Sequence, residues 1–315
     1  MNSKVVLGMA TYNSGEGHVF ESIKSIQEQT FRNFELIIYE DPSKNSLSKK
    51  ILTLIESDPR ITYIKGEERL GSCRSFDFLL KNGLENNATY FAWVTDHDLF
   101  HKEWLESLIK TLQKDRNALV AYPQTQCIDS FGNEIKQNIF LNKTSPPYSN
   151  NLMSPIKRVI SFAFLRAGAG DIAHGLFNAK ILRMSAVRWP IKITPDKLFL
   201  LRLMRFGSIT SLDKTLFFRR EKEEEIVFTK ANMMVERQLN SIFLGKTPKI
   251  YSFFNYRFVN FFYLLKHEVV FGIKAKHNIL ISILIPFLYF FCSIIFLFHH
   301  IQGFLYVRLK KIRIK

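Results

Sequence analysis

The sequence predicts an α/β protein: a mostly parallel sheet flanked by helices, followed by C-terminal hydrophobic helices that associate with a membrane. Two observations lead to this prediction. Between residues 4 and 128, short apolar runs alternate with segments whose apolar residues recur at helical spacing, and this alternation is typical of βαβ units. Near the C-terminus, residues 279–298 contain no charge, and a run of this length can cross a hydrocarbon core of ~30 Å.

The expected elements follow one another at short spacing. Strands are predicted at residues 5–11, 34–39, 61–64, 90–95 and 118–122. Helices are predicted at residues 19–26, 48–57, 72–84 and 104–112. Right-handed crossovers place such helices on both faces of the sheet, and ligands bind at the carboxyl ends of the strands. Later in the chain we expect a turn at 130–133 between two strands, a loop at 143–155, a buried stretch at 174–177 and a helix at 196–206.

The composition divides the 315-residue chain into three parts. We expect an α/β domain over residues 1–225, an aromatic-rich helical connector over 226–275, and a membrane-associated hydrophobic segment with a basic tail over 276–315. Basic residues flank the apolar run on both sides, so it can be a single span, a re-entrant hairpin or an interfacial helix. The alternative is a buried core helix, although a charge-free run of this length is rare in soluble cores.

The formal net charge of +16 indicates anionic partners: nucleic acids, phosphorylated ligands or an anionic membrane surface. The sequence has no zinc-finger spacing, RNA-binding signature or basic region followed by heptads, so nucleic acid is not an expected partner. The C-terminal basic cluster suits lipid headgroups. The three cysteines lie far apart and no signal-peptide pattern is visible, so we expect the α/β domain in the cytoplasm.

The sharpest local motif is Thr95-Asp96-His97-Asp98, at the end of the apolar run 90–94. Two carboxylates two residues apart at a strand end can face one cation. Mg²⁺ and Mn²⁺ take oxygen ligands, commonly one or two carboxylates together with substrate phosphates. The alternative is a pair of solvated loop aspartates that cap the next helix.

Polar residues also follow the other predicted strands. Thr11 and Asn13 close the first strand and can line a nucleotide pocket, or can form an ordinary turn. Asp41 follows the second strand and can accept hydrogen bonds from a base or ribose, although Asp-Pro-Ser is also good turn chemistry. Arg74 lies beside a predicted helix N-terminus, which is a plausible phosphate site, although a lone arginine is more often a surface charge.

Taken in order, these segments resemble glycosyltransferase family 2 on the GT-A fold. The segments are Thr11-Tyr12-Asn13 after a strand, Glu40-Asp41 after the next, Leu70-Gly71 before a helix, Asp96-His97-Asp98 after a strand, and Trp104-Leu105. The resemblance covers residues 4–220 and is strongest over the first ~125, a stretch that includes most of the predicted βαβ units.

Members of this family transfer a sugar from a nucleotide diphosphate to an acceptor, usually with inversion. The resemblance implies that Asn13 and Asp41 lie by the nucleoside, with Thr11 and Arg74 also on the donor side. It implies that Asp96 contacts the ribose or a metal-bound diphosphate, and that Asp98 binds the metal ion, Mn²⁺ or Mg²⁺.

The resemblance also assigns residues in the second half of the domain. Asp196, before the predicted helix, matches the acidic residue that acts as the base, and a carboxylate there can deprotonate the acceptor hydroxyl. The alternative is an N-cap after Pro195. His174 and Gly175 resemble an acceptor-side segment, and Arg219-Arg220 resembles a late arginine motif that meets the diphosphate, with Arg219 as the expected contact. A buried strand and a surface charge are the alternatives for these.

The leading hypothesis is therefore an inverting, metal-dependent glycosyltransferase at a membrane, of the hexosyltransferase type. It would act on a glycan or lipid-linked acceptor in cell-surface polysaccharide or glycolipid synthesis. One alternative is a nucleotidyltransferase, but Ser14-Gly15-Glu16-Gly17 lacks the basic residue of a phosphate loop. The other is a non-catalytic membrane-associated protein that retains a nucleotide-binding fold.

Overall fold

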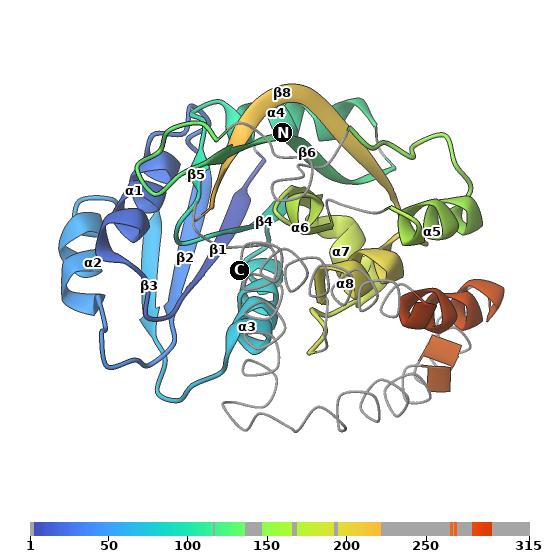
Figure 1. The fold of residues 1–315 in the computed structure, drawn as a ribbon, viewed down its shortest axis with the longest axis horizontal. Coiled ribbons are helices and arrows are strands. Elements are labelled where there is room, and N and C mark those ends of the chain that lie inside the picture. The colour runs from blue at the N-terminus through green and yellow to red at the C-terminus, as the bar shows by residue number, and fades with distance from the viewer. Residues whose placement is uncertain are drawn as a thin grey trace, which may run out of the picture.

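The computed structural model contains one mixed sheet of eight strands, in the order β3-β2-β1-β4-β7-β6-β8-β5, with helices on both of its faces (Figure 1). This confirms the predicted α/β fold class. The residues that the structure describes are 3–115, 117–135, 147–165, 169–191, 195–221, 265–266, 268–269 and 279–291.

The first half of the sheet is parallel, as the sequence predicts. Its elements are β1 (Val5–Thr11), α1 (Glu16–Gln27), β2 (Phe34–Glu40), α2 (Ser48–Ile55), β3 (Ile61–Lys65), α3 (Ser72–Glu85) and β4 (Tyr90–Val94). Strand β1 lies between β2 and β4 and pairs with both in parallel register. Side chains of β1, β2 and β4 are buried on both faces, which is why these strands read as continuous apolar runs.

The second half of the sheet is mixed. It is built from β5 (Leu99–Phe100), α4 (Trp104–Lys114), β6 (Ala118–Ile128), α5 (Pro155–Ala163), α6 (Ala169–Ala173), β7 (Leu176–Asn178), α7 (Ala179–Ser185), α8 (Pro195–Leu203) and β8 (Ser208–Arg220). Strand β7 pairs antiparallel with both β4 and β6, while β8 runs parallel to β6 and antiparallel to β5. The prediction missed β5 and β8, and the predicted helix 196–206 ends at Leu203 because the chain turns there into β8.

Two hydrophobic clusters cover the two faces of the sheet. The cluster under α3, α5 and α8 is centred on Trp93 of β4, which contacts four aromatic rings besides Phe91: those of Phe76, Phe177, Trp189 and Phe199. Aromatic pairs of this kind stabilise a core beyond the area that they bury. The Trp93 indole N–H donates to the Phe76 carbonyl at 3.0 Å, so β4 and α3 are fixed relative to each other.

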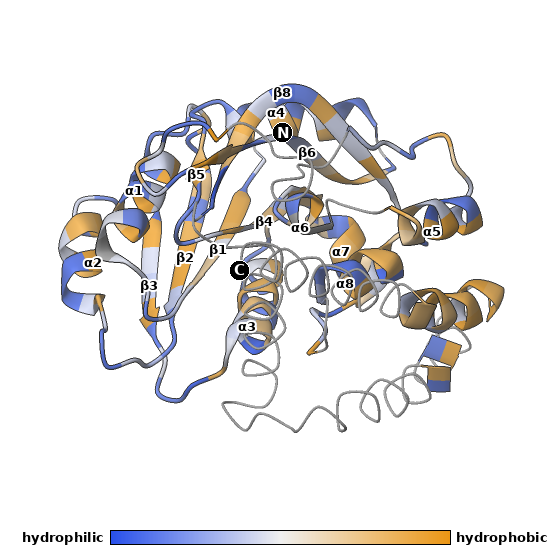
Figure 2. Cartoon of the chain, in the orientation of Figure 1, coloured by the Kyte–Doolittle hydropathy of each residue, from blue (hydrophilic) through white to orange (hydrophobic). Residues whose placement is uncertain are grey.

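Residues 279–291 form a helix beside α5 and α8, drawn in red-orange in Figure 1 and mostly apolar in Figure 2. Ile281, Ile285 and Tyr289 belong to the same buried cluster as α5 and α8. Within the part of the chain that the structure describes, no helix is both long and apolar enough to cross a membrane. Most of the predicted connector 226–275, and residues 292–315, lie outside the described residues.

A buried ion pair ties the C-terminal part of the chain to the α/β domain. Glu268, which is 2% exposed, accepts hydrogen bonds from Arg202 of α8, at 2.5 Å, and from Arg205. Arg205 also donates to the Ser282 hydroxyl at 3.3 Å. Because these charges are buried, we expect that removing one of them would lower the stability of the protein.

Replacing Glu268 by Gln is expected to destabilise the protein by about 3 kcal/mol, because it removes the carboxylate charge that faces the buried Arg205 guanidinium. Urea unfolding measures the loss. Glu85→Gln is a matched control, since Glu85 pairs with Lys81 at 3.9 Å on the surface and such pairs contribute about 0.5 kcal/mol. Equal losses in the two variants would show that the Glu268 pair is not buried.

Candidate active site

The carboxyl ends of β1, β2 and β4 meet at one edge of the sheet, and a chain of hydrogen bonds joins the loops that follow them. The Asp41 amide donates to the Thr11 carbonyl at 3.0 Å. The Thr11 hydroxyl donates to that of Ser14 at 3.1 Å, and Ser14 donates to the Asp96 carboxylate. The structure therefore brings together Thr11, Asp41 and Asp96, as predicted. Ser14 is a link that the sequence reasoning missed.

Asp41 holds the N-terminus of α3. Its carboxylate, buried in the structure, accepts hydrogen bonds from the amides of Leu70, at 2.9 Å, and Gly71, at 2.8 Å. Gly71 has a φ of 75°, a conformation that favours glycine. A carboxylate at this position is stabilised by the exposed N–H groups of the helix. Arg74, in the first turn of the helix, is half-buried and donates to the Leu70 carbonyl at 3.5 Å.

The loop after β1 presents an aromatic ring at the same edge. Tyr12 is 44% exposed, and the Arg69 guanidinium carbon lies 4.4 Å from the centre of its ring. Asn13 adopts a left-handed conformation, with φ of 51°, and its side-chain oxygen accepts a hydrogen bond from Asn45 at 2.9 Å. Asn13 thus bridges the loops after β1 and β2, next to Asp41.

Asp96 and Asp98 both face the imidazole of His97. Nδ1 of His97 lies 2.8 Å from a carboxylate oxygen of Asp96, and Nε2 lies 3.8 Å from one of Asp98. Burial lowers the pKa of His97, but the Asp96 hydrogen bond and the two carboxylate charges outweigh it and raise this pKa to about 9. Burial raises the pKa of Asp96, but hydrogen bonds from His97 and Ser14 bring it below its ordinary value.

Asp96 and Asp98 are the candidate ligands for a divalent cation in this structure. Each Asp98 oxygen accepts one hydrogen bond, from the Thr95 hydroxyl at 2.6 Å and from the Arg220 amide at 2.7 Å, and a carboxylate oxygen has a second lone pair. The two carboxylates converge on a position that a protonated imidazole already fills. Among the described residues no group of three or more His, Cys, Asp or Glu side chains can hold a metal ion, so substrate phosphates and water would have to complete the ligand set.

The Arg220 side chain connects the Asp96-His97-Asp98 motif to other segments of the chain. It donates to the His97 carbonyl at 2.8 Å, to the Ser130 carbonyl at 2.8 Å and to the Glu21 carboxylate at 2.5 Å. Three segments that lie far apart in the sequence therefore meet at one guanidinium at the end of β8. The sequence indicated the pair Arg219-Arg220, with Arg219 as the expected diphosphate contact, and did not predict this role of Arg220.

Arg219 is engaged elsewhere. Its guanidinium donates to the buried Asp171 carboxylate at 2.7 Å and to Glu221 at 3.0 Å. The predicted contact with a diphosphate would require Arg219 to leave or share these partners. Asp171, three residues before His174, was also missed by the sequence reasoning, because a single acidic residue in an irregular region carries no pattern.

His174 is half-buried, within electrostatic reach of both Asp98 and Asp196. Its ring lies 5.9 Å from that of Phe217, and Nδ1 donates to the Trp93 carbonyl at 3.2 Å. Burial lowers the pKa of His174, and Asp98 is the largest charge opposing that shift. Burial raises the pKa of Asp196, while Lys197 and His174 lower it in part. Asp196 lies in the first turn of α8, and its electrostatic interaction with His174 connects it to the surroundings of Asp98.

Gly175 makes a close backbone approach to β6. A Cβ atom added there would lie 2.6 Å from the Ala121 carbonyl oxygen and 2.8 Å from a Val120 methyl carbon. The structure thus gives Gly175 a packing role that positions His174. Whether Gly175 also contacts an acceptor stays a prediction.

Gly175→Ala is expected to destabilise the protein by roughly 2 kcal/mol, because the added methyl group overlaps a backbone carbonyl that cannot move without shifting β6. Thermal unfolding measures this change. Gly17→Ala is the matched control, since nothing lies within 4 Å of the added carbon at that position. Unchanged stability of Gly175→Ala would contradict the close approach.

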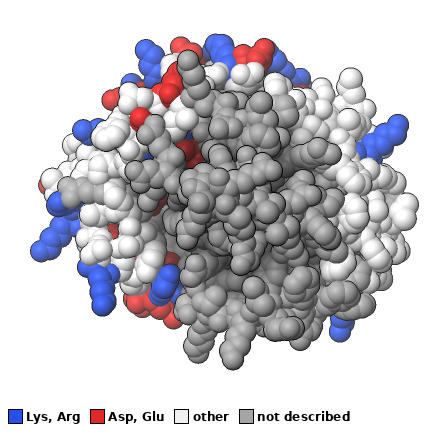
Figure 3. All heavy atoms as spheres, viewed as in Figure 1, with Lys and Arg blue, Asp and Glu red and all other residues white. Residues whose placement is uncertain are grey.

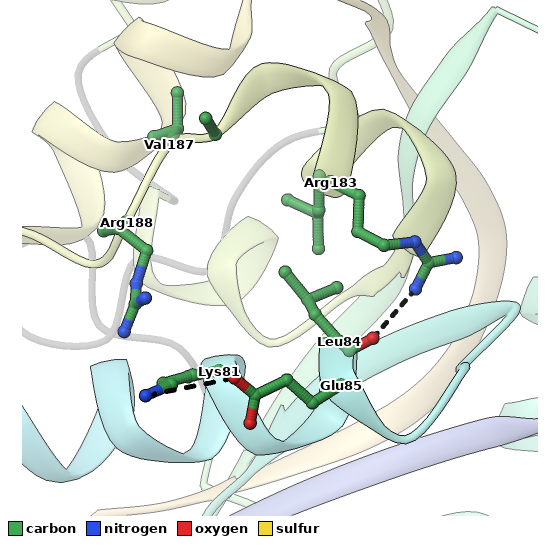
Figure 4. Close-up of a pocket in the computed structure, with 8 residues that line it drawn as sticks. Lys81, Leu84, Glu85, Arg183, Val187 and Arg188 are labelled. Atoms are coloured by element: carbon green, nitrogen blue, oxygen red, sulfur yellow. Dashed lines mark hydrogen bonds and ion pairs between the residues drawn. The ribbon is translucent and has the colours of Figure 1, made fainter.

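A pocket lies between α3 and α7 (Figure 4), but it is separate from this site. Lys81, Glu85, Arg183 and Arg188 line it, and Arg183 donates to the Leu84 carbonyl at 3.3 Å. The pocket lies at the C-terminal end of α3, whereas Asp41 binds the N-terminal end of that helix. None of the predicted site residues lines it.

The family model for Glycosyl transferase family 2 matches residues 7–187. The chain belongs to this family, which confirms the resemblance seen in the sequence. An uncharacterized glycosyltransferase of Methanocaldococcus jannaschii is 33% identical over 132 residues, 41% of this chain and 44% of that protein. An uncharacterized glycosyltransferase of Rickettsia typhi is 26% identical over 245 residues, 76% of this chain and 70% of that protein. The match spans less than half the length of the first curated relatives.

Solved structures have a similar fold. The structure of S. aureus TarS 1-349 in complex with UDP-GlcNAc superposes with a TM-score of 0.52 and 17% identity, covering 76% of this chain and 67% of that one. The complex of the same TarS fragment with UDP gives a TM-score of 0.52. At this identity the likeness establishes the fold, which is of the GT-A type with a curled sheet.

Proposed function

We propose that this protein transfers a sugar from a nucleoside diphosphate donor to an acceptor hydroxyl, with inversion. The observation that carries the proposal is the continuous set of contacts from Asp41 through Thr11 and Ser14 to Asp96, at the carboxyl ends of parallel strands. Ligands of such sheets bind at this edge. Family membership supports the reaction class, and the TarS complexes with UDP and UDP-GlcNAc make a uridine nucleotide the first donor to test.

In the proposed arrangement the nucleoside lies along the loops after β1 and β2. Asn13 and Asp41 flank that position, and the exposed Tyr12 ring offers a flat surface for a planar base. Arg74, in the first turn of α3, and the helix N-terminus itself favour a negatively charged diphosphate. Asp96 then lies where the ribose and diphosphate meet.

A divalent ion would be held by Asp98, with Asp96 beside it, and when bound would neutralise the charge of the departing diphosphate. His97 would have to yield the position between the two carboxylates. Because imidazolium and metal ion compete for that position, Mn²⁺ or Mg²⁺ is expected to bind more tightly as the pH rises.

Asp196 is proposed as the base. Its carboxylate takes the proton of the acceptor hydroxyl while that oxygen bonds to the anomeric carbon and the bond to the nucleoside diphosphate breaks. Attack from the face opposite the leaving group inverts the anomeric centre. A carboxylate whose pKa is raised by burial accepts a proton more readily near neutral pH.

The proposal also includes the setting of the reaction. The acceptor is a glycan or a lipid-linked saccharide in cell-surface polysaccharide or glycolipid synthesis, and the chain attaches through residues 276–315 to the cytoplasmic side of a membrane. The basic C-terminal cluster and the charge-free run at 279–298 support the attachment.

Calorimetry with UDP, GDP, CDP and dTDP, each with and without Mn²⁺, tests the donor site. One nucleotide is expected to bind, and to bind at least tenfold more tightly with the metal. Hydrolysis of the matching nucleotide sugar then separates an enzyme from a non-catalytic protein that retains the fold. The donor-site proposal fails if no nucleoside diphosphate binds under any of these conditions.

A further inference from the structure

The helix formed by residues 279–291 has two apolar faces, one that is buried and one that is exposed. Ile281, Ser282, Ile285 and Tyr289 are buried. The exposed face repeats at about four-residue spacing and consists of Ile279, Leu280, Ile283, Phe287 and Phe291. An ordinary surface helix is polar on its outer side. Here the outer side is as apolar as the inner one, so it needs a separate explanation.

The inner face fixes this helix to the α/β domain. Ile281, Ile285 and Tyr289 pack in the same cluster as α5 and α8, and Ser282 accepts a hydrogen bond from Arg205 at 3.3 Å. A helix with one side buried against a domain lies beside a bilayer more readily than across it.

A second element extends the exposed face. Ile160 of α5 is exposed, and Phe164, which follows α5, is 57% exposed. The Phe164 ring lies 6.3 Å from that of Phe291. In Figure 3 the right-hand part of this view, where α5 and residues 279–291 lie, shows few charged side chains. We use the term apolar face for Ile160, Phe164, Ile279, Leu280, Ile283, Phe287 and Phe291.

The sequence around this face favours a lipid surface over a protein partner. The apolar run continues to residue 298, and five basic residues lie among the last eight of the chain. Aromatic and aliphatic side chains beside a basic cluster are typical of segments that lie in the interface of an anionic membrane. The net charge of +16 acts in the same direction.

We infer that the apolar face is a membrane-docking surface that lies in the plane of an anionic bilayer, and that the catalytic domain rests on the membrane through two elements, α5 and the helix of residues 279–291. This goes beyond the proposed attachment by naming the surface and deciding between spanning and interfacial binding. Because Asp196 lies in the first turn of α8, which packs in the same cluster as this helix, docking also sets the distance of the proposed base from the lipid surface. That last consequence alone rests on the proposed function.

Vesicle flotation of the full chain tests the docking surface. Vesicles of phosphatidylcholine with phosphatidylglycerol are expected to bind the wild type, and Ile283→Asp and Phe164→Asp are each expected to weaken binding roughly tenfold, because each places a charge in the apolar interface. Leu52→Asp on α2 is the matched control: Leu52 is 49% exposed against 38% for Ile283, lies outside the apolar face, and its replacement should leave binding unchanged.

Three results would overturn the inference. Vesicle binding by Ile283→Asp and Phe164→Asp equal to that of the wild type would place attachment elsewhere. Retention of the wild type on vesicles through carbonate extraction would show a spanning segment. A dimer that Ile283→Asp dissociates without a change in vesicle binding would assign the face to a second copy of the chain. Nucleotide binding, measured on the same variants, reports on folding and on the donor site, so failure of the docking surface and failure of the proposed function can be told apart.

Discussion

Asp98→Asn is expected to lower kcat/KM for the nucleotide sugar about a thousandfold and to remove its dependence on Mn²⁺. A metal-held phosphate contributes several kcal/mol of charge stabilisation, and about 1.4 kcal/mol corresponds to a factor of ten in rate. Asparagine keeps the size of the side chain; its oxygen can still accept the Arg220 amide, while its NH2 group can donate to the Thr95 hydroxyl. The loss of charge is therefore tested with little change in shape. Steady-state kinetics across a series of Mn²⁺ concentrations measure the effect.

The control for Asp98→Asn has to show whether a loss of activity comes from the missing charge or from a less stable protein. Asp58→Asn removes another carboxylate with low exposure, one that pairs with Arg60 at 2.7 Å in the turn before β3. It should cost some stability and leave metal dependence intact. If Asp98→Asn kept the Mn²⁺ dependence of the wild type, Asp98 would be a purely structural residue that fixes the end of β8.

Asp196→Asn is expected to lower kcat roughly 10²- to 10⁴-fold, the usual contribution of a general base, while leaving nucleotide affinity close to that of the wild type. Rapid-quench measurement of a single turnover, together with calorimetry for the nucleotide, distinguishes these two quantities. A tenfold loss of nucleotide binding with unchanged chemistry would place Asp196 in the donor site instead.

The pH dependence of kcat/KM is a second test of Asp196 as the base. A base must be deprotonated, so kcat/KM should rise with pH through the pKa of Asp196. Burial raises that pKa, so the midpoint of the acid limb should lie above the ordinary aspartate value of about 3.9. Lys197 lowers the pKa of Asp196, so Lys197→Met is expected to move the midpoint further upward. If Lys197→Met left the midpoint of the acid limb unchanged, the titrating group would be one other than Asp196.

The first half of the fold could be predicted from the sequence because its signals are local. Strands β1, β2 and β4 are buried on both faces and appear as unbroken apolar runs, and the helices between them keep helical spacing. Their order alone then brings the residues after β1, β2 and β4 to one edge of the sheet. This is why the sequence could predict that Thr11, Asp41 and Asp96 lie near one another; their roles in binding stay predictions.

The second half could not be predicted in the same way. Strand β8 pairs with β6 through three irregularities in register, and its burial does not alternate, so it lacks the two-residue period of a regular strand. Strand β5 has only two residues. Neighbouring strand residues point to opposite sides, and with irregular register the sequence cannot say which of Arg219 and Arg220 faces the Asp96 motif. The sequence pointed to the pair with Arg219 preferred, and the structure shows that Arg220 is the one that contacts the motif.

The position of Arg220 has a consequence for how the protein is made. The aspartate pair is synthesised early, but its brace is the final residue of β8, more than 120 positions later. During translation at about 5–20 residues per second, an N-terminal segment waits several seconds or longer for a distant partner. A nascent chain halted before that residue should therefore bind nucleotide poorly even if its first four strands have already paired, and the ability to hold a donor should emerge late in synthesis.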